Sequence, residues 1–412
     1  MPVFTYLCLD CTKTMEPFLD SLLKSRYAAE KKSILALCEK GDTFSLADLA
    51  RELGTSIPKV TRIVSDMEQA GILSDWGKQE SATGRRPSLY GLNPEAGYFI
   101  GVEVGQETLA LAVTDFTGRL VQFQDGIDYT LKNTEESVLG LCTCVRKHAR
   151  PFLDPDRVRA VGVNLTGRVN HQTGYSYSYY ISEEKPIRDL LEAGFGLPVF
   201  IENDSRGMAF GEYMSGIAGD AHTVLFLNVG WGLGMGMVLD GKLFNGKSGF
   251  SGEIGHFPLL DNNQICRCGK VGCLETGASG LALHRLIGER LAKGHPSILS
   301  AAYAGHRSIT LNDILDAVAR EDVTAIECVE QVGDTLGRAV AGLINIFNPD
   351  VVVIGGRLSV TEQYLMPPLL SAVNRLSLNL VNNDTVIKVS RLGNKAGAVG
   401  ASLLSKHRLI NR

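Results

Sequence analysis

Residues 98–121 read YFIGVEVGQETLALAVTDFTGRLV, in which short apolar runs alternate with turn residues. We expect two strands in this stretch, at residues 99–104 and 109–114, because apolar and β-branched residues dominate both runs. A Thr-Gly turn at residues 117–118 leads into a third strand that begins at residues 120–121. The stretch therefore predicts that a sheet starts here.

Further strand candidates follow along the chain, separated by helical stretches such as residues 187–192 and 322–347. These strand candidates are residues 158–163, 199–201, 224–229, 235–239 and 351–354. Strands that alternate with helices in this order predict an α/β protein with mixed sheets.

The composition sets limits on partners and location. The chain has 412 residues, 44% of them hydrophobic and 21% charged, which is typical of a globular protein of roughly two or three domains. A net charge of −4 excludes a positive field over the whole surface, so any contact with nucleic acid must be local. The most apolar stretch, residues 223–239, contains Asn228 and four glycines, so we expect buried strands there and no membrane span.

The N-terminus and the cysteines favour a cytoplasmic protein. The first residues lack the positive region of a signal peptide. The chain has nine cysteines, and three of them lie together, which is more typical of metal ligation in a reducing compartment than of a disulfide framework. Met15 is an alternative start to Met1, so residues 1–14 are a candidate extension or disordered arm.

Between residues 28 and 92 the periodicity is helical and then hairpin-like. Ser45 can cap a short amphipathic helix, with Asp48 placed to complete a capping box and Gly54 placed to end the helix. After this turn, Ser56 can cap a second helix that has Pro58 in its first turn. The apolar stripe of the second helix consists of Val60, Ile63, Val64 and Met67. The opposite, partly basic stripe consists of Pro58, Lys59, Thr61, Arg62, Ser65 and Gln69. This pattern predicts a helix-turn-helix whose second helix enters the major groove of DNA.

Residues 72–73 and 83–92 then predict a hairpin with a basic tip that can contact phosphates or a narrow minor groove. We therefore expect a winged helix-turn-helix DNA-binding domain over residues 27–92, after an N-terminal extension at 1–26. The expected DNA-binding residues are Ser56, Lys59, Thr61, Arg62, Ser65, Arg85 and Arg86. The alternative is a small helical subdomain with a solvated loop, since residues 1–97 hold 12 Lys/Arg against 13 Asp/Glu, a net charge of −1. The concentration of positive charge on the second helix and the wing favours DNA binding.

Four residues supply a candidate metal site: His256, Cys266, Cys268 and Cys273. One imidazole and three thiolates form a closed tetrahedral set that suits a structural Zn²⁺ and leaves no position for water. Gly269 and Gly272 allow the tight turns that this spacing requires. The alternative, ordinary buried cysteines, is less favoured because three cysteines fall within eight residues.

Several spaced motifs give the sequence a family resemblance. From about residue 28 to 412 the chain resembles the regulators of the ROK family (repressors, open reading frames and kinases), in the branch of NagC, Mlc and XylR. The segments that carry the resemblance are SATGRRPSLYGLNPEAGYFIGVEVG, GLPVFIENDSRGMAFGE, NGKSGFSGEIGHFPL, CRCGKVGCLE and NPDVVVIGG.

The resemblance implies a winged helix-turn-helix fused to an actin-like, sugar-kinase-type body of two α/β lobes with a cleft between them. It implies a small lobe at residues 93–215, completed by residues 394–412, and a larger lobe at 216–393 that carries the zinc site. The family's zinc ligands fall on the same four positions that the spacing suggested.

The resemblance also implies a sugar site. The residues that would hold sugar hydroxyls are Asn203, Asp204, Glu253, His256 and Glu275. Carboxylates and an amide that converge in a cleft satisfy the donors and acceptors of a sugar. His256 can ligate zinc through one nitrogen and donate to a hydroxyl from the other. Asp204 would be the general base in a kinase, and Glu202, Asn203 and Asp204 can equally cap a helix that begins near Ser205.

The phosphate loops depart from those of the kinases in the family. Where the kinases have Asp-x-Gly-Gly-Thr-Lys, residues 103–108 read Glu-Val-Gly-Gln-Glu-Thr, so the Lys is absent and Glu107 brings negative charge. The second loop, Gly-Thr-Gly in kinases, reads Gly-Trp-Gly at residues 230–232. A Gly-Gly pair at 355–356, which would face adenosine, survives, although it also serves as a turn.

These residues favour a sugar-responsive transcriptional regulator, expected to repress carbohydrate-utilisation genes, over an enzyme. The partners we expect are operator DNA, a sugar or sugar phosphate, and a second copy of the chain in a homodimer or tetramer. The alternative is a ROK sugar kinase with a fused DNA-binding domain. The sequence leaves open the identity and phosphorylation of the sugar, the operator, repression against activation, and a protein effector.

Overall fold

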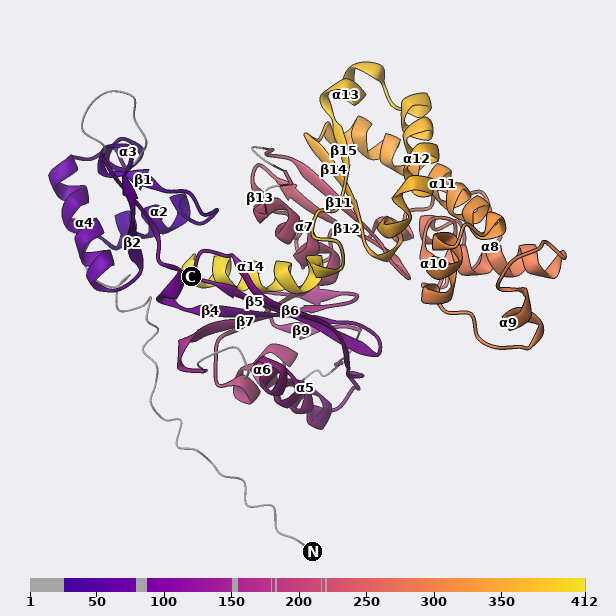
Figure 1. Cartoon of the computed structure of the whole chain (residues 1–412), viewed down its shortest axis with the longest axis horizontal. Helices are drawn as coiled ribbons and strands as arrows, with labels where there is room; N and C mark the ends of the chain where they lie inside the picture. Colours follow the sequence, from indigo (N-terminus) through magenta and orange to yellow (C-terminus); the bar gives the residue numbers. More distant parts are fainter. Residues whose placement is uncertain are drawn as a thin grey trace, which may run out of the picture.

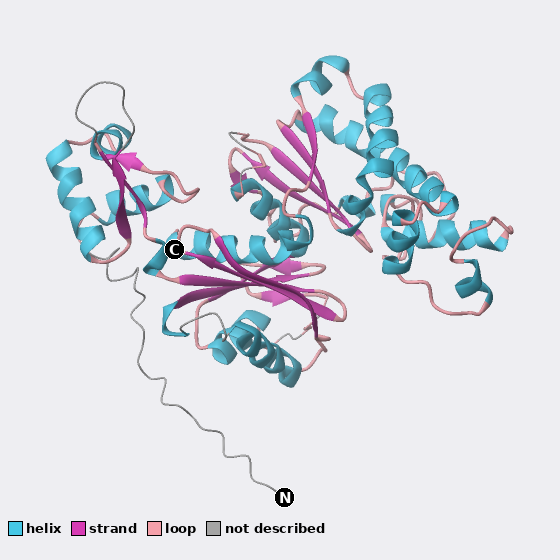
Figure 2. Cartoon of the chain, viewed as in Figure 1, coloured by secondary structure: helices cyan, strands magenta, loops and turns pink. Residues whose placement is uncertain are grey.

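Three parts follow one another along the chain in the computed structural model, namely an N-terminal module, a small lobe and a large lobe (Figure 1). The structure describes residues 26–78, 87–149, 155–178, 180–181, 184–215, 217–218 and 221–411. Helices cover both faces of the sheet in the small lobe, and both lobes contain parallel and antiparallel strand pairs (Figure 2). The predicted α/β class with mixed sheets is therefore confirmed.

Within residues 26–78 and 87–92, the N-terminal module has three helices and a three-stranded sheet in the order β1-β3-β2. Its elements are α2 (Ala28–Leu37), β1 (Phe44–Ser45), α3 (Leu46–Glu52), α4 (Ile57–Gln69), β2 (Leu73–Lys78) and β3 (Ser88–Leu92). Ser45 and Asp48 form the predicted capping box, and Gly54 follows α3 with a φ of +59°. Ser56 occupies the N-cap position of α4 without a side-chain hydrogen bond.

The apolar stripe of α4 is buried as predicted, because it packs against α2, α3 and the sheet. Strands β2 and β3 pair antiparallel, which confirms the predicted hairpin. Arg85 and Arg86 lie outside the described residues.

The small lobe is built on a five-stranded sheet in the order β10-β7-β4-β5-β6. Its strands are β4 (Tyr98–Val104), β5 (Thr108–Asp115), β6 (Leu120–Asp128), β7 (Val158–Leu165) and β10 (Val199–Asn203), with a small hairpin of β8 (Val169–Asn170) and β9 (Tyr175–Ser176). One face packs on α5 (Glu135–Ala149) and α6 (Ile187–Phe195), and the other on α7 (Asp204–Met214) and α14 (Ala396–Ile410). Short 3-10 turns lie at η1 (Pro94–Ala96), η3 (Pro155–Arg157) and η7 (Gly393–Lys395).

The large lobe is built on a second five-stranded sheet in the order β13-β12-β11-β14-β15. Its strands are β11 (Val224–Val229), β12 (Leu233–Leu239), β13 (Lys242–Leu243), β14 (Val351–Gly355) and β15 (Val386–Val389). Its helices are α8 (Gly280–Ala292), α9 (Ser300–Ala304), α10 (Leu311–Ala319), α11 (Val323–Phe347), α12 (Glu362–Leu376) and α13 (Asn379–Asp384), with turns η4 (Ile254–His256), η5 (Leu274–Thr276) and η6 (Arg357–Thr361). One core cluster joins one face of this sheet to α8, α10, α11 and α12.

Helix α14 returns from the end of the chain to the first strands of the small lobe (Figure 1). Gly101 on β4 and Gly162 on β7 leave no room for a Cβ, because the carbonyls of Ala398 and Ala401 lie directly against them. The Thr114 and Ser402 hydroxyls share a buried hydrogen bond of 2.7 Å.

The N-terminal module shares its apolar core with the small lobe. Phe99, Phe116, Ala160, Leu409 and Ile410 belong to the same buried cluster as α2, α3 and α4. The module is therefore seated on the small lobe, with only residues 93–97 between β3 and β4.

In the part of the chain that the structure describes, no helix combines the length and the apolar character needed to span a membrane.

Candidate functional site

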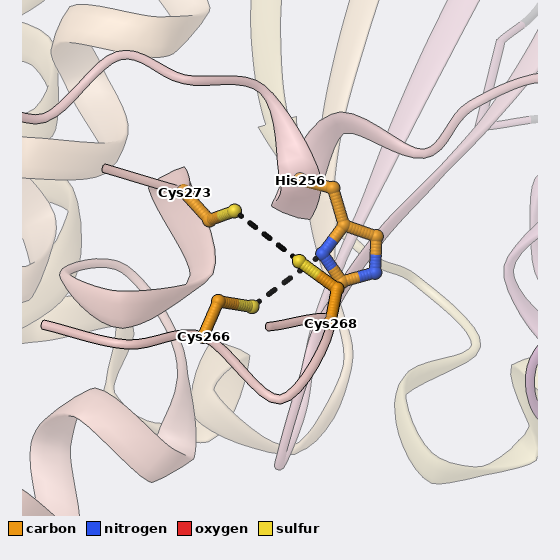
Figure 3. A group of neighbouring side chains, drawn as sticks. All are labelled: His256, Cys266, Cys268 and Cys273. Carbon is orange, nitrogen blue, oxygen red and sulfur yellow. Dashed lines mark hydrogen bonds between the residues drawn. The ribbon is translucent and has the colours of Figure 1, made fainter. Parts of the chain in front are cut away.

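The four predicted metal ligands converge on one point of the large lobe (Figure 3). Their ligand atoms all lie within 4.8 Å of one another. The Cys266 Sγ lies 3.6 Å from His256 Nδ1, and the Cys268 and Cys273 Sγ atoms are 3.6 Å apart, much farther than the roughly 2.05 Å of a disulfide. Such a set can hold a metal ion.

The local fold that gathers these ligands is a small loop with hardly any regular structure. Residue pairs Ile265–Val271 and Pro258–Cys273 form isolated antiparallel bridges, so the loop folds back beside η4. The Cys266 N–H donates to the Lys270 carbonyl at 2.7 Å. Gly269 and Gly272 have φ values of +84° and +81°, which a residue with a side chain adopts at a cost.

Three predicted sugar residues lie at this metal-ligand cluster. His256 belongs to it, and Glu253 and Glu275 lie beside it. Glu253 Oε2 lies 3.8 Å from His256 Nε2, so the two nitrogens of the imidazole face opposite ways: Nδ1 toward a cysteine and Nε2 toward a carboxylate. Glu275 Oε2 accepts a 3.0 Å hydrogen bond from the Leu233 N–H at the start of β12, and its Oε1 lies 3.9 Å from Cys266 Sγ.

The other two predicted sugar residues, Asn203 and Asp204, lie at the N-terminus of α7. The Asn203 side-chain oxygen accepts from the Arg206 N–H at 3.1 Å, and its amide donates to the Gly167 carbonyl and to Asp204 Oδ1. The predicted helix cap is thus present, with Asn203 at the N-cap position.

The two groups approach the same strand of the large lobe. The Ser205 hydroxyl, next to Asp204, accepts from the Asn228 amide at 3.1 Å and lies directly over Gly234 on β12. Gly234 follows Leu233, whose N–H holds Glu275. The structure therefore brings Ser205, which follows Asp204, and Glu275 to neighbouring positions along β12.

A buried ion cluster fixes the end of β10 beside Asn203. Glu202 lies 2.7 Å from the Arg206 guanidinium and accepts a short hydrogen bond from Arg408 on α14. A third neighbour of Glu202 is His171, at 3.9 Å. Burial alone would raise the pKa of Glu202, but the charges of Arg408 and Arg206 outweigh burial and lower it to about 2.

The sequence around Glu202 suggests only a helix cap. The i, i+4 spacing of Glu202 and Arg206 was an available signal, whereas the pairing with Arg408 spans 206 positions of sequence.

A further acidic residue, Glu103, lies at the end of β4, and it forms an acidic pair with Asp204. Burial raises the pKa of Glu103 to about 8, and the negative charges of Asp204 and Asp125 push it the same way, against Arg357. Burial also raises the pKa of Asp204, although hydrogen bonds from Ser205 and Thr166 oppose the rise. Glu103 lies against Gly397 at the start of α14, where no Cβ would fit.

The loops predicted to depart from phosphate binding lie around this pair. The Gly105 N–H donates to the Thr108 carbonyl at 2.9 Å, which closes a tight turn with Glu107 exposed. The Trp231 ring packs 5.9 Å from the ring of His284 on α8. Gly356, with a φ of +82°, follows β14 and lies against Asn228 and Val229.

The predicted DNA-binding residues of α4 have different surroundings. Lys59 is half-buried and pairs with Glu30 at 2.5 Å, while the Thr61 hydroxyl donates to the Ile57 carbonyl. Ser65 lies 3.5 Å from the Gln69 amide. Arg62 is exposed and pairs with no carboxylate within the described residues.

The module meets the body at the turn after α2. Lys406 is fully buried, and its Nζ donates to the Glu39 carbonyl at 2.9 Å and to the Thr117 carbonyl at 3.1 Å. The Glu39 carboxylate lies 2.9 Å from His407 Nδ1. Lys40 stacks 4.0 Å over the ring of Tyr213, at the C-terminal end of α7. The helices that contact this turn are thus α7, which begins at Asp204, and α14, which carries the Arg408 that binds Glu202.

Comparison with known proteins places these features in a family. The profile described as "ROK family" matches residues 99–408. The chain is 28% identical to the xylose repressor of Caldicellulosiruptor bescii, over 83% of this chain and 86% of the relative.

Two solved structures are similar to the whole chain or to its body. A ROK family transcriptional regulator described as a homologue of the Escherichia coli MLC protein matches 92% of this chain and 96% of its own, with 28% identity and a TM-score of 0.77. A ROK family glucokinase from Streptomyces griseus, solved with glucose and AMPPNP, matches 76% of this chain and 100% of its own, with 28% identity and a TM-score of 0.67.

Proposed function

Because the chain belongs to the ROK family, we propose that it is a sugar-responsive transcriptional repressor that binds operator DNA through its N-terminal module. The observation that carries this proposal is the coverage of the two structural matches. The glucokinase is matched over its full length by 76% of this chain, whereas the regulator is matched by 92% of it. A part of this chain that has no counterpart in the glucokinase therefore has a counterpart in the regulator.

The geometry of the module supports DNA binding. Helix α4 buries one stripe and leaves the other exposed, as a recognition helix requires. Arg62 is the best candidate for a base contact, since its guanidinium is exposed, whereas Lys59 is held by Glu30. We propose a winged helix-turn-helix over residues 27–92, with Ser56, Thr61 and Ser65 as further DNA contacts and Arg85 and Arg86 on the wing. One such helix reads few base pairs, so we propose a homodimer on a two-fold operator.

We propose that the metal-ligand cluster holds a structural Zn²⁺. The donors fit this ion, because one imidazole and three thiolates lie within 4.8 Å of one another. A bound zinc would fix the orientation of the imidazole, leaving His256 Nε2 and Glu253 to bind a sugar hydroxyl. Glu275 would contribute from the other side of the cluster, and Asn203 would hold Asp204 in place.

A sugar kinase is the second candidate, because the body resembles a glucokinase. Three features disfavour phosphoryl transfer here. The turn at residues 103–108 has no Lys, Glu107 is exposed where a phosphate grip is expected, and the Trp231 indole replaces a small hydroxyl residue. Asp204 does not discriminate between the two functions, because it would bind sugar in either case.

We propose that sugar binding to the body affects DNA binding by the module through the junction between the two. A sugar that touches Asp204 on one lobe and Glu253, His256 and Glu275 on the other would favour a closed arrangement of the lobes. Movement of α7 and α14 would reach the module through Tyr213 and His407, which contact the turn at Glu39 and Lys40. Closure would then change the spacing of the two recognition helices in the dimer.

The proposal is tested by selecting bound DNA from a random-sequence duplex library with the full chain. We expect a two-fold symmetric site, and Arg62→Ala should weaken binding to it by about 1–3 kcal/mol while relaxing the preference at one base position. Arg320→Ala, on the exposed surface of the large lobe, removes the same charge and should leave binding unchanged.

The same preparations should show no ATP-dependent phosphorylation of glucose, mannose or N-acetylglucosamine. Steady turnover of any of these sugars, or DNA binding that does not depend on residues 26–92, would contradict the assignment.

A further inference from the structure

Two carboxylates lie at the proposed sugar site, Glu103 at the end of β4 and Asp204 at the start of α7. Glu103 contacts the first turn of α14, and α14 packs directly on α7, where Gly400 lies against Gly207. Glu103 accepts no side-chain hydrogen bond from the residues that the structure describes, whereas Asp204 accepts hydrogen bonds from the side chains of Asn203, Ser205 and Thr166 and from the Ser205 N–H. Glu253 and Glu275 add two more carboxylates from the large lobe.

Three arginines near this pair make their hydrogen bonds to other groups. Arg206 and Arg408 both bind the buried Glu202 carboxylate. Arg357 donates a short hydrogen bond to the Asn312 side chain, although its charge still acts on Glu103. Burial and the charge of Arg408 lower the pKa of His171.

The helix termini are also occupied. Asn203 and Asp204 cap α7, and the Glu103 carboxylate lies at the first turn of α14. These are the places where backbone N–H groups would otherwise receive a phosphate. A further basic residue nearby is Arg168, which is exposed and follows Gly167, the residue whose carbonyl accepts from the Asn203 amide.

Such an environment fits hydroxyl groups better than a dianion. A hydroxyl can donate a hydrogen bond to either carboxylate, so both can bind a sugar. A phosphate dianion offers only acceptors, and it would bring two further negative charges beside these carboxylates.

Resting on the proposed sugar-responsive function, we infer that the ligand is an uncharged monosaccharide and that Glu103 and Asp204 exclude its phosphate ester. The specificity lies in the negative charge at the ends of β4 and β10. A sugar phosphate, which has the remaining hydroxyls of its parent sugar, binds more weakly because these two residues repel the phosphate.

Calorimetric titration of the full chain with matched pairs tests this inference. The probes are glucose and glucose 6-phosphate, N-acetylglucosamine and its 6-phosphate, and xylose and its 5-phosphate. For each pair in which binding occurs, we expect the uncharged member to bind at least tenfold more tightly. Glu103→Gln should narrow that ratio severalfold, because it removes an ionisable carboxyl at nearly constant volume, whereas Glu330→Gln, exposed on α11, should leave the ratio unchanged.

The outcomes separate this inference from the proposed function. A sugar phosphate that binds as tightly as its parent sugar, with affinity lost in Arg168→Ala, would overturn the inference and leave a sugar-responsive regulator standing. A preference for the uncharged sugar that survives in Glu103→Gln and Asp204→Asn would overturn the role of this pair. Failure of every sugar and sugar phosphate to bind would overturn both proposals.

Discussion

The two clusters beside the proposed sugar residues differ in what holds them together. In the Glu202 cluster on the small lobe, a buried carboxylate meets two guanidinium groups of the same chain. The metal-ligand cluster on the large lobe lies in an irregular loop, and Cys268, one of its four ligands, is exposed. The charged groups of the first cluster pair with one another, whereas the side chains of the second form a set that could hold a metal ion.

This difference means that the two halves of the site can be disturbed separately. Changes at Glu202 should act on the global stability of the small lobe and on Asp204. Changes at the metal-ligand cluster should act locally on Glu253, His256 and Glu275. Four predictions test this separation.

Glu202→Gln is expected to have the largest effect. Removing the charge leaves the guanidinium groups of Arg206 and Arg408 buried and unpaired, which should lower the free energy of unfolding by about 3–5 kcal/mol. Urea denaturation followed by circular dichroism measures the loss. Glu289→Gln breaks an exposed ion pair of the same i, i+4 type and should cost less than about 1 kcal/mol, so equal losses in the two variants would contradict the distinction.

Acid should remove the same interaction in the unmodified protein. The folded pKa of Glu202, about 2, lies below its unfolded value of 4.5, so its stabilising contribution is fully present above pH 4.5. The contribution should be lost as the pH falls from about 4.5 to 2, and it amounts to about 3 kcal/mol. Urea midpoints measured across this range should fall more steeply in the unmodified protein than in Glu202→Gln, and parallel curves would refute the assignment.

Cys268→Ser should act on the other half of the site. Because the Cys268 side chain is exposed, the change costs little packing, yet it removes one of four metal ligands. We expect metal content measured by mass spectrometry to fall from about one zinc per chain toward zero, and sugar affinity to weaken about tenfold. Cys144→Ser, outside the cluster, is the control. Unchanged sugar affinity in a variant shown to be zinc-free would break the link between metal and sugar.

His407→Gln should have the smallest effect, because it lies between the Glu202 cluster and the N-terminal module. Losing the contact with Glu39 should leave operator and sugar affinities near those of the unmodified protein. The factor by which sugar changes the operator affinity should decrease, but by less than about tenfold. Such a decrease corresponds to the loss of part of a typical coupling free energy. His295→Gln, an exposed change on the large lobe, should leave this factor alone. A large loss of operator affinity without sugar would mean that His407 holds the module in place and does not transmit the signal.

Local patterns in the sequence predicted much of the fold. The capping box at Ser45, the buried stripe of α4 and the strands at the start of the small lobe depend on neighbours within a few residues, so periodicity reveals them. The metal-ligand cluster was equally accessible, since three of its residues lie within a single loop.

Long-range pairings could not be predicted in this way. The contacts of Glu202 with Arg408 and of Glu39 with His407 span 206 and 368 positions. Nothing in the sequence around Glu103 indicates that the charge of Asp204 acts on it, because β4 and α7 come together only through the packing of the small lobe. Periodicity alone does not distinguish helices α8, α10 and α12, whose apolar faces pack against α11 in one core cluster.

The return of α14 to β4 and β5 also sets the order in which the protein matures. Thr114 and Ser402 meet across 288 positions, so at 5–20 residues per second a ribosome delivers the second partner roughly 15 to 60 s after the first. Until then, the face of β4 and β7 at Gly101 and Gly162 has no α14 packed on it. Leu409 and Ile410 are also missing from the core on which the N-terminal module is seated. A nascent chain thus carries its N-terminal module long before it carries all of the apolar surface on which that module is seated. Under the proposed function, a half-made chain has its DNA-binding module but lacks the contact through which the body would control it.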